Sequence, residues 1–167
     1  MFLDESRCNT DMTRRYAYSL GGSRAVDSAP LSKPKNTTIL SSIQLDGTLR
    51  YTTFSGGTTV ERFKRYLETD LLPHLNGNSV LIMDNMKSHH AKAVKNLLDS
   101  SEIRYIYLPP YSPDLNPIEK LWSKVTAFLR KFKARTLDAL PNAIQNAFHS
   151  VTISDCSGWF RFCGYAL

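Results

Sequence analysis

The stretch SVLIMD, residues 79–84, decides the fold because it contains a continuous apolar run that ends on an acid, Asp84. A short uninterrupted apolar run predicts a strand buried on both faces, as in the parallel part of an α/β sheet. Apolar residues at helical spacing then predict a helix over about residues 88–99, and IRYIYL, residues 103–108, has the composition of a second strand. The order strand, helix, strand predicts a parallel crossover and an α/β fold.

Upstream of this unit, TTILSSIQLDGTLRYTTFSG, residues 37–56, predicts two antiparallel strands joined at Asp46-Gly47, which is a strong hairpin signal. Residues 20–36 are rich in Gly, Ser and Pro and predict a long loop before the hairpin. After the hairpin, the apolar spacing of residues 59–75 predicts a helix that starts at Thr58 or Thr59 and stops at Pro73.

Downstream, LPPYSPDLNPIEKLW, residues 108–122, predicts a proline-rich loop that leads into a helix. Asn116, Pro117 and Glu119 have the spacing of an N-cap, a first-turn proline and the third residue of a capping box. The helix is amphipathic, with an apolar stripe formed by Ile118, Leu121, Trp122, Val125, Phe128, Leu129 and Phe132. A further helix is predicted over residues 137–148, and the aromatic residues 156–167 are expected to close over the core.

The length of 167 residues and an apolar fraction of 42% predict a single domain, residues 1–167. No signal peptide and no membrane span is predicted, so a cytoplasmic location is expected. Cys8, Cys156 and Cys163 lack metal or disulfide spacing and are expected to be buried reduced thiols. The net charge of +6 arises in residues 85–135, which carry ten Lys or Arg and four Asp or Glu, and this excess favours a polyanionic partner.

Three acids stand where a crevice is expected at the carboxyl ends of parallel strands: Asp4, Asp84 and Glu119. Each also has a local interpretation, because an aspartate at a strand end often caps the next turn and Glu119 suits a capping box. Converging carboxylates repel one another and need a cation, and oxygen ligands suit Mg²⁺ or Mn²⁺. The trio therefore predicts a metal site, with His89 and His90 as supporting residues at most.

DNMKSHH at Asp84 and YLPPYSPDLNPIEKLW, residues 107–122, together resemble the DDE transposases of bacterial insertion sequences related to the mariner superfamily. In that family the second aspartate begins a DN-x-x-x-H motif and the third acid closes a PYSP-(D/E)-LNPIE motif. The opening FLDES resembles the segment around the family's first aspartate and maps it onto Asp4. TRRYAYSLGG, residues 13–22, and the closing GWFRFCGY are also similar, so the resemblance covers nearly the whole chain.

The resemblance implies an RNase H-like fold, a mixed five-stranded sheet flanked by helices. It implies that Asp4, Asp84 and Glu119 are catalytic and hold two Mg²⁺ or Mn²⁺ ions, with Asn85, His89 and Asn116 orienting them. The implied reaction is metal-dependent cleavage of DNA at transposon ends, followed by transfer of the freed 3′-hydroxyl into target DNA. The alternative is an inactive, truncated remnant that at most binds DNA.

DNA is the implied partner, bound by a homodimer in the bacterial cytosol and associated with the nucleoid. The family's helix-turn-helix modules normally precede the first aspartate, so this chain is expected to be an N-terminally truncated catalytic domain. A separate or frameshift-fused helix-turn-helix part is then an expected partner. The candidates for contacts with DNA phosphates are Arg14, Arg15, Lys87, Lys120, Lys124, Arg130, Lys131 and Lys133, with the two arginines expected on an early strand.

Overall fold

The computed structural model of the protein describes residues 1–31 and 34–165. Its centre is a five-stranded sheet with the order β3-β2-β1-β4-β5. The strands are β1 (Phe2–Cys8), β2 (Thr37–Ile43), β3 (Leu49–Ser55), β4 (Val80–Met83) and β5 (Arg104–Tyr107). β1, β2 and β3 are antiparallel neighbours, whereas β4 and β5 run parallel to β1. The predicted mixed five-stranded sheet is confirmed.

The turn between β2 and β3 lies at the predicted Asp46-Gly47 pair. Thr48 donates its backbone N–H to the carboxylate of Asp46 at 2.8 Å, and Gly47 has a φ of +88°. A Cβ at position 47 would also lie 2.9 Å from Cγ1 of Ile153. Glycine is therefore required here both by the left-handed backbone and by the approach of the last helix.

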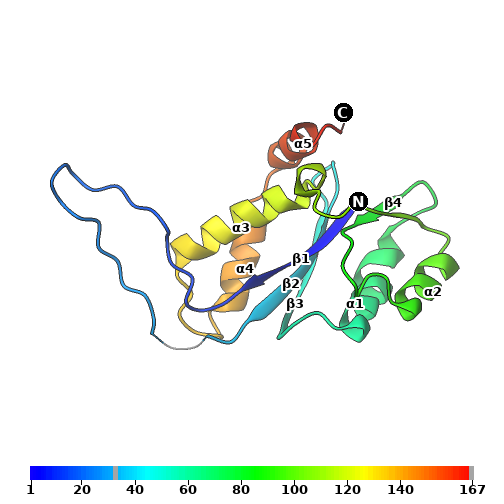
Figure 1. Ribbon diagram of the computed structural model, residues 1–167, viewed down its shortest axis with the longest axis horizontal. Coiled ribbons are helices and arrows are strands. Elements are labelled where there is room, and N and C mark those ends of the chain that lie inside the picture. Colours follow the sequence, from blue (N-terminus) through cyan, green and yellow to red (C-terminus); the bar gives the residue numbers. More distant parts are fainter. Residues whose placement is uncertain (32–33, 166–167) are drawn as a thin grey trace.

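Five α-helices surround the sheet (Figure 1): α1 (Val60–Tyr66), α2 (Lys92–Ser100), α3 (Ile118–Phe132), α4 (Leu140–His149) and α5 (Ile153–Phe162). α1 begins at its N-cap Thr59 as predicted and continues as a π-helical turn, Leu67–Leu71, and a short 3₁₀ turn, Leu72–His74, that contains Pro73. A second 3₁₀ turn, Pro113–Leu115, precedes α3. α3 has the predicted extent, and its apolar stripe faces the core.

The strand residues alternate between two apolar clusters, one on each face of the sheet. Phe2 and Cys8 of β1 pack with α3, α4 and α5, whereas Leu3 packs with α1 and α2. Successive side chains of a strand point to opposite faces, so Asp4 shares the face of Phe2, and Glu5 shares the face of Leu3. This separation of two neighbouring acids determines the layout of the site described below.

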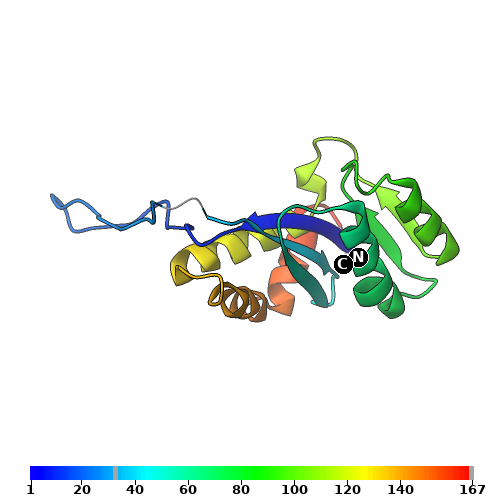
Figure 2. The same ribbon diagram turned by 90° about the horizontal axis from the view of Figure 1, so that it is seen from below.

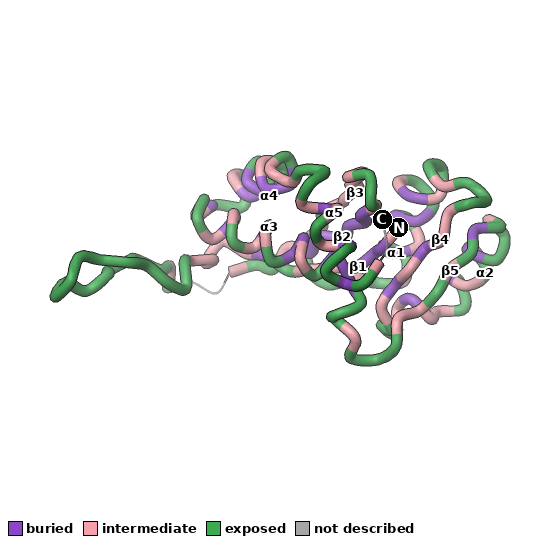
Figure 3. The backbone as a smooth tube through the Cα atoms, turned by 90° about the horizontal axis from the view of Figure 1, so that it is seen from above, coloured by how far each residue is buried: buried purple, intermediate pink, exposed green. Residues whose placement is uncertain are grey.

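An extended arm, residues 9–31, projects from the body between β1 and β2 (Figure 2). Residues 14–29 of the arm are exposed (Figure 3), and Tyr18 and Leu31 have the full accessibility of isolated side chains. Arg14 and Arg15 lie on this arm, so their predicted placement on an early strand is wrong. β1 ends at Cys8 because its partner strand begins opposite it, at Thr37.

Three other local predictions also need correction. α2 begins at Lys92, four residues later than predicted, because the chain after Asp84 first forms turns closed by bonds such as His89 N–H to the Met86 carbonyl, 3.0 Å. α4 begins at Leu140, since the preceding residues form a turn at Thr136. β4 is buried fully only at Leu81 and Met83 and not on both faces.

The C-terminal helix closes the core as predicted. Phe160 of α5 meets Phe2 of β1 edge to face, with ring centroids 5.4 Å apart. The three cysteines are buried and unpaired, which confirms that they are free thiols. None of the helices formed by residues 1–31 and 34–165 has the length and apolar character needed to cross a membrane.

Candidate active site

Asp4 and Asp84 are aligned by the register of two parallel strands. β1 and β4 pair Phe2 with Ile82 and Leu3 with Met83, so the next positions along both strands are Asp4 and Asp84. Adjacent strands lie about 4.8 Å apart, so the two aspartates are neighbours at the carboxyl end of β4. The sequence predicted a crevice at this end of the parallel strands.

Asp4 is 7% exposed and is held by two hydrogen bonds. Its Oδ2 accepts the indole N–H of Trp122 at 3.1 Å, and its Oδ1 accepts the backbone N–H of Glu5 at 2.7 Å. Burial raises the pKa of Asp4 to about 7, and repulsion from Asp84 and Glu119 adds to the increase. The three predicted acids are therefore close enough for their charges to interact, and Asp4 faces the helix that carries Glu119.

Asp84 is controlled by His89, which lies in the turn after β4. Nδ1 of His89 is 2.7 Å from Oδ1 of Asp84, and its Nε2 is 3.2 Å from Oε2 of Glu5. Burial alone would raise the pKa of Asp84, but the hydrogen bond and the charge of His89 outweigh it and keep that pKa below its ordinary value. Burial alone would lower the pKa of His89, but its two carboxylate partners raise it to about 9. Asp84 is thus an ionised carboxylate beside an imidazolium.

The His89 residue is fixed by a stacked ring and by its backbone carbonyl as well as at its ring nitrogens. It is fully buried and stacks on Phe63 with ring centroids 4.2 Å apart. Tyr107 of β5 donates its hydroxyl to the His89 carbonyl at 2.9 Å. The neighbouring His90 stacks on Tyr107 and hydrogen bonds to Asn85, so the predicted motif residue Asn85 contacts His90 and not Asp84.

Glu119 stands in the first turn of α3, one turn before Trp122. Burial raises its pKa, and repulsion from Asp84 contributes further. The predicted capping box is wrong, because α3 begins at Ile118 after Pro117 and no side chain caps it. Asn116 is buried at 4% exposure, and its Oδ1 has no hydrogen-bond partner among the described residues. Neither side chain is therefore committed to the helix end, which leaves both available to a ligand.

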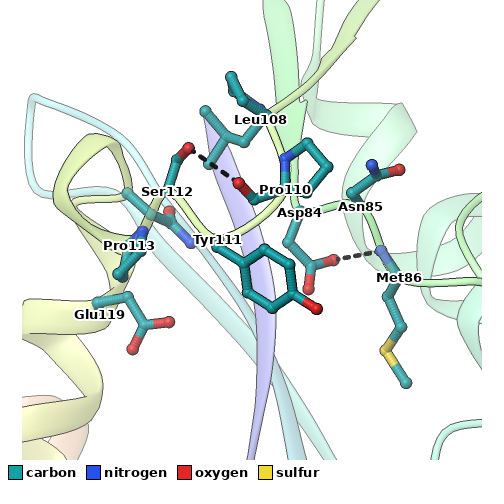
Figure 4. A pocket seen from close by; sticks show the side chains of 11 residues that line it. Asp84, Asn85, Met86, Leu108, Pro110, Tyr111, Ser112, Pro113 and Glu119 are labelled. Atoms are coloured by element: carbon teal, nitrogen blue, oxygen red, sulfur yellow. Dashed lines mark hydrogen bonds between the residues drawn. The ribbon is translucent and has the colours of Figure 1, made fainter.

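A cavity of about 430 Å³ lies at Asp84 and Glu119 (Figure 4), whereas Asp4 is not among the residues that line it. Asp84 and Glu119 line it on its polar sides, together with Asn85 and Asn116. The proline loop forms an apolar wall with Leu108, Pro109, Pro110, Tyr111 and Pro113. The ring of Tyr111 extends between the carboxylates of Asp84 and Glu119 in this view. The cavity therefore combines paired acids with a flat apolar surface.

The donor set of the site fits a hard divalent cation, because all three acids supply oxygen ligands. Burial raises the pKa of Asp4 and of Glu119, and repulsion from the charge of Asp84 adds to both increases. Across residues 1–31 and 34–165, however, no three His, Cys, Asp or Glu side chains already surround a point that could hold a metal ion. Asp4 is instead hydrogen bonded to Trp122, and Asp84 contacts His89.

The eight predicted phosphate-binding residues differ in how far other side chains already engage them. Lys124 pairs with Asp155, Lys133 pairs with Asp27, and Nζ of Lys120 lies 3.8 Å from the ring centroid of Phe162. Arg15 and Arg130 line a common cavity of about 340 Å³ with Arg7, which the sequence analysis did not single out. The residues that remain exposed and form no salt bridge within the described part of the chain are Arg14, Arg15, Lys87 and Lys131.

Two partners of the acids were missed by the sequence analysis. Glu5 had a signal, because a residue next to Asp4 on a strand must face the opposite side of the sheet. Trp122 had a weaker signal, since it was expected only in the apolar stripe of α3, three residues after Glu119. Its N–H donor is the part of the side chain that reaches Asp4.

Comparison with known proteins identifies similar chains. The profile of a family described as "DDE superfamily endonuclease" matches residues 1–141. The Transposable element Tc1 transposase of Caenorhabditis elegans is 28% identical over 97 residues, which are 56% of this chain and 36% of that protein. The Transposable element Tcb2 transposase of Caenorhabditis briggsae is 29% identical over 75 residues, 45% of this chain and 28% of that protein. The match thus spans about a third of the length of these relatives.

The solved structures with similar folds include complexes of Mos1 transposase. The Mos1 paired-end complex with the left transposon end superimposes with a TM-score of 0.79 at 19% identity, covering 96% of this chain and 50% of that chain. The catalytic domain of Mos1 mariner transposase gives a TM-score of 0.68 at 16% identity, covering 98% of this chain and 78% of that chain. The mixed five-stranded sheet with its helices is therefore an RNase H-like fold, as expected.

Proposed function

The chain belongs to the DDE superfamily endonuclease family, and on that premise we propose that it is the catalytic domain of a transposase that cleaves and joins DNA strands with divalent metal ions. The observation that carries the proposal is the alignment of Asp4 and Asp84 on adjacent parallel strands, with Glu119 on the helix that also contacts Asp4 through Trp122. In this proposal, the three acids come from β1, from the residue after β4 and from α3, and they act at the carboxyl end of β4.

In this proposal, Asp4, Asp84 and Glu119 hold two Mg²⁺ or Mn²⁺ ions. Mos1 complexes have been solved with Mg and with Mn, which supports the choice of cation. When bound, such ions supply Lewis-acid activation of water and of the phosphodiester. The reaction is hydrolysis of a phosphodiester at a transposon end, and then in-line attack of the freed 3′-hydroxyl on a phosphodiester of target DNA.

The protein's own residues prepare this chemistry in different ways. His89 keeps Asp84 ionised and fixes its Oδ1, so this acid is ready to bind a cation. Asp4 carries a proton near neutral pH until a cation replaces it, because it is buried beside two other acids. Arg14, Arg15, Lys87 and Lys131 are exposed on the same chain and supply positive charge for DNA phosphates.

The wider assembly is also part of the proposal. The DNMKSHH and YSPDLNPIE motifs resemble those of the DDE transposases of insertion sequences. On this basis we include a homodimer that acts on transposon ends, an origin in an insertion sequence and a helix-turn-helix partner. The relatives that support DNA as the partner include structures of Mos1 with a transposon end and of a Mos1 strand transfer complex. These features extend the proposed activity of the domain and are tested separately from it.

Nicking of supercoiled plasmid DNA tests the core of the proposal, because it needs no knowledge of the transposon end. We expect nicking that depends on Mg²⁺ or Mn²⁺ and that Asp84→Asn and Glu119→Gln each reduce by at least a hundredfold. Asp138→Asn is the matched control, since Asp138 is exposed and lies outside the site. Nicking that Asp84→Asn leaves unchanged would show that the assigned site is wrong. Metal-independent DNA binding without nicking would favour the alternative, a non-catalytic DNA-binding domain.

A further inference from the structure

Tyr111 lies in the proline loop and lines the same cavity as Asp84 and Glu119. Its side chain is fully exposed, at 102% of the reference accessibility, although tyrosine is normally at least partly covered. Its φ of +59° places a bulky residue in the left-handed region. Prolines at positions 110 and 113 confine the loop on both sides. The loop therefore carries both an energetic cost and an uncovered aromatic ring at the mouth of the cavity.

Asn116 supplies an independent observation in the same cavity. Its side chain is only 4% exposed, and its Oδ1 accepts no hydrogen bond from any described residue. A buried acceptor without a partner costs free energy that a bound donor would recover. Nucleobases carry such donors on their edges, as N–H groups in the plane of the ring. An aromatic face and a buried amide in one cavity are therefore complementary to the face and the edge of a base.

One side of the cavity is acidic and the other is apolar. A nucleotide likewise has a charged phosphate and a flat, largely apolar base. The acids Asp84 and Glu119 suit a phosphodiester bound through cations, and the wall of Leu108, three prolines and Tyr111 suits a flat apolar ring. The volume of about 430 Å³ lies within the range of small-ligand sites. Figure 4 shows that the Tyr111 ring extends from the apolar wall toward the two carboxylates, so a stacked base would lie next to a phosphodiester held there.

We propose that this cavity is a nucleobase subsite, in which Tyr111 stacks on the base adjoining the phosphodiester that the acids cleave and Asn116 accepts a hydrogen bond from that base. The proposal rests on the proposed function for the identity of the ligand as DNA. Because every base has a flat face, the stacking accepts any sequence. Tyr111 is therefore a binding residue that positions the strand, and it takes no part in proton transfer.

The test uses photochemical cross-linking of the full chain to a short single-stranded oligonucleotide that carries 5-iododeoxyuridine at alternate positions, so that every register places a probe next to the cavity. In the presence of Mg²⁺, we expect a cross-link whose peptide maps to Tyr111. Tyr111→Phe retains the aromatic face and should keep the cross-link at position 111. Tyr111→Leu should lose it and should weaken binding, followed by fluorescence anisotropy, by roughly 5- to 150-fold, the equivalent of about 1–3 kcal/mol.

Tyr18→Leu is the matched control, because Tyr18 is equally exposed but lies on the arm. It should leave the cross-link at Tyr111 in place. A cross-link that maps to the arm instead, or an affinity that Tyr111→Leu leaves unchanged, would overturn the subsite. Asn116→Leu should weaken binding in the same assay, whereas retention of full affinity would remove Asn116 from it.

The failure of the subsite can be distinguished from failure of the proposed function. Asp84→Asn should abolish plasmid nicking but leave the cross-link at Tyr111, because the base and the metal-binding acids occupy different walls of the cavity. Nicking that depends on Asp84 without a cross-link at position 111 would preserve the catalytic proposal and reject the subsite. The cross-link without any nicking would preserve the subsite and reject the catalytic proposal.

Discussion

Nε2 of His89 lies 3.2 Å from Oε2 of Glu5, although the two residues are 84 positions apart in the chain. The same ring contacts Asp84 through Nδ1 at 2.7 Å, so Glu5 and Asp84 are linked through one buried imidazole. Glu5 lies next to Asp4 but faces the opposite side of the sheet. One strand therefore supplies a proposed metal ligand on one face and a support for another proposed ligand on the opposite face.

Glu5→Gln tests this link with little change in shape. Loss of the Glu5 charge should lower the pKa of His89 from about 9 toward 6.5, which histidine NMR titration measures directly. The affinity for Mn²⁺, measured by calorimetry, should fall by roughly 10- to 100-fold, as expected for a residue that orients a metal ligand. Glu102→Gln, at an exposed position, is the control. An unchanged His89 pKa would mean that the contact does not influence the site.

The stability of the metal-free protein should depend on pH because the pKa of Asp4 is raised. Because the folded pKa of about 7 is above the ordinary 3.8, the folded state keeps a proton that the unfolded state has released, and stability should fall as pH rises between these values. The N–H of Trp122 bonded to Asp4 provides a probe, since its NMR resonance should titrate near pH 7. Asp4→Asn should abolish the titration, whereas Trp159, the only other tryptophan, should not report it. A flat Trp122 resonance from pH 5 to 9 would contradict the assignment.

Divalent metal should stabilise the protein more at alkaline than at acidic pH. A cation that binds the ionised acids must compete with the proton on Asp4, so the gain in melting temperature on adding Mn²⁺ should increase through pH 7. At a hundredfold excess over the dissociation constant the stabilisation is about 2.7 kcal/mol. Calorimetric melting with Mn²⁺ and after chelation provides the measurement. A gain that is equal in wild type and in Asp84→Ala would place the metal elsewhere.

The closing helix should depend on Asp155. Thr152 and Asp155 form a complete capping box at the start of α5, and Asp155 also pairs with Lys124 of α3. Asp155→Ala should therefore lower the free energy of unfolding by about 1 kcal/mol, as for a lost cap. Urea denaturation measures the change, and Asp138→Ala, at an exposed aspartate outside any helix, should have almost no effect. Equal stability of the two variants would show that the cap contributes nothing.

Elements with strong local signals were predicted from the sequence. The Asp46-Gly47 turn, the strands at residues 80–83 and 104–107 and the whole extent of α3 depend on periodicity and turn chemistry within a few residues. The neighbouring positions of Asp4 and Asp84 also followed, because β1 and β4 are adjacent parallel strands in register. The joint role of these two acids with Glu119 stays a prediction. These features need no knowledge of distant contacts.

The errors arose where distant contacts decide the local structure. Asn116 matches an N-cap in sequence, but the chain places it in the cavity wall with its side chain away from the helix end. α2 begins at Lys92 and not near residue 88 as predicted, because His89 lies in a turn where its side chain contacts Glu5 and Phe63. The strained backbone of Tyr111 is a property of the folded loop and has no local signal, since tyrosine rarely has a positive φ.

The pairing of Asp4 with Ser41 across β1 and β2 has a consequence for the chemistry as well as for the fold. A slip of β1 by one residue could place Glu5 where Asp4 now faces α3, and Ser6 would then stand where Glu5 now faces His89. The place beside Trp122 would keep an acid whose side chain is longer by one methylene, but the place beside His89 would lose its carboxylate. The hydrogen-bonded register between β1 and β2 thus determines which of two adjacent acids faces α3. A one-residue insertion in β1 could therefore exchange the acid at this position without removing any carboxylate from the protein.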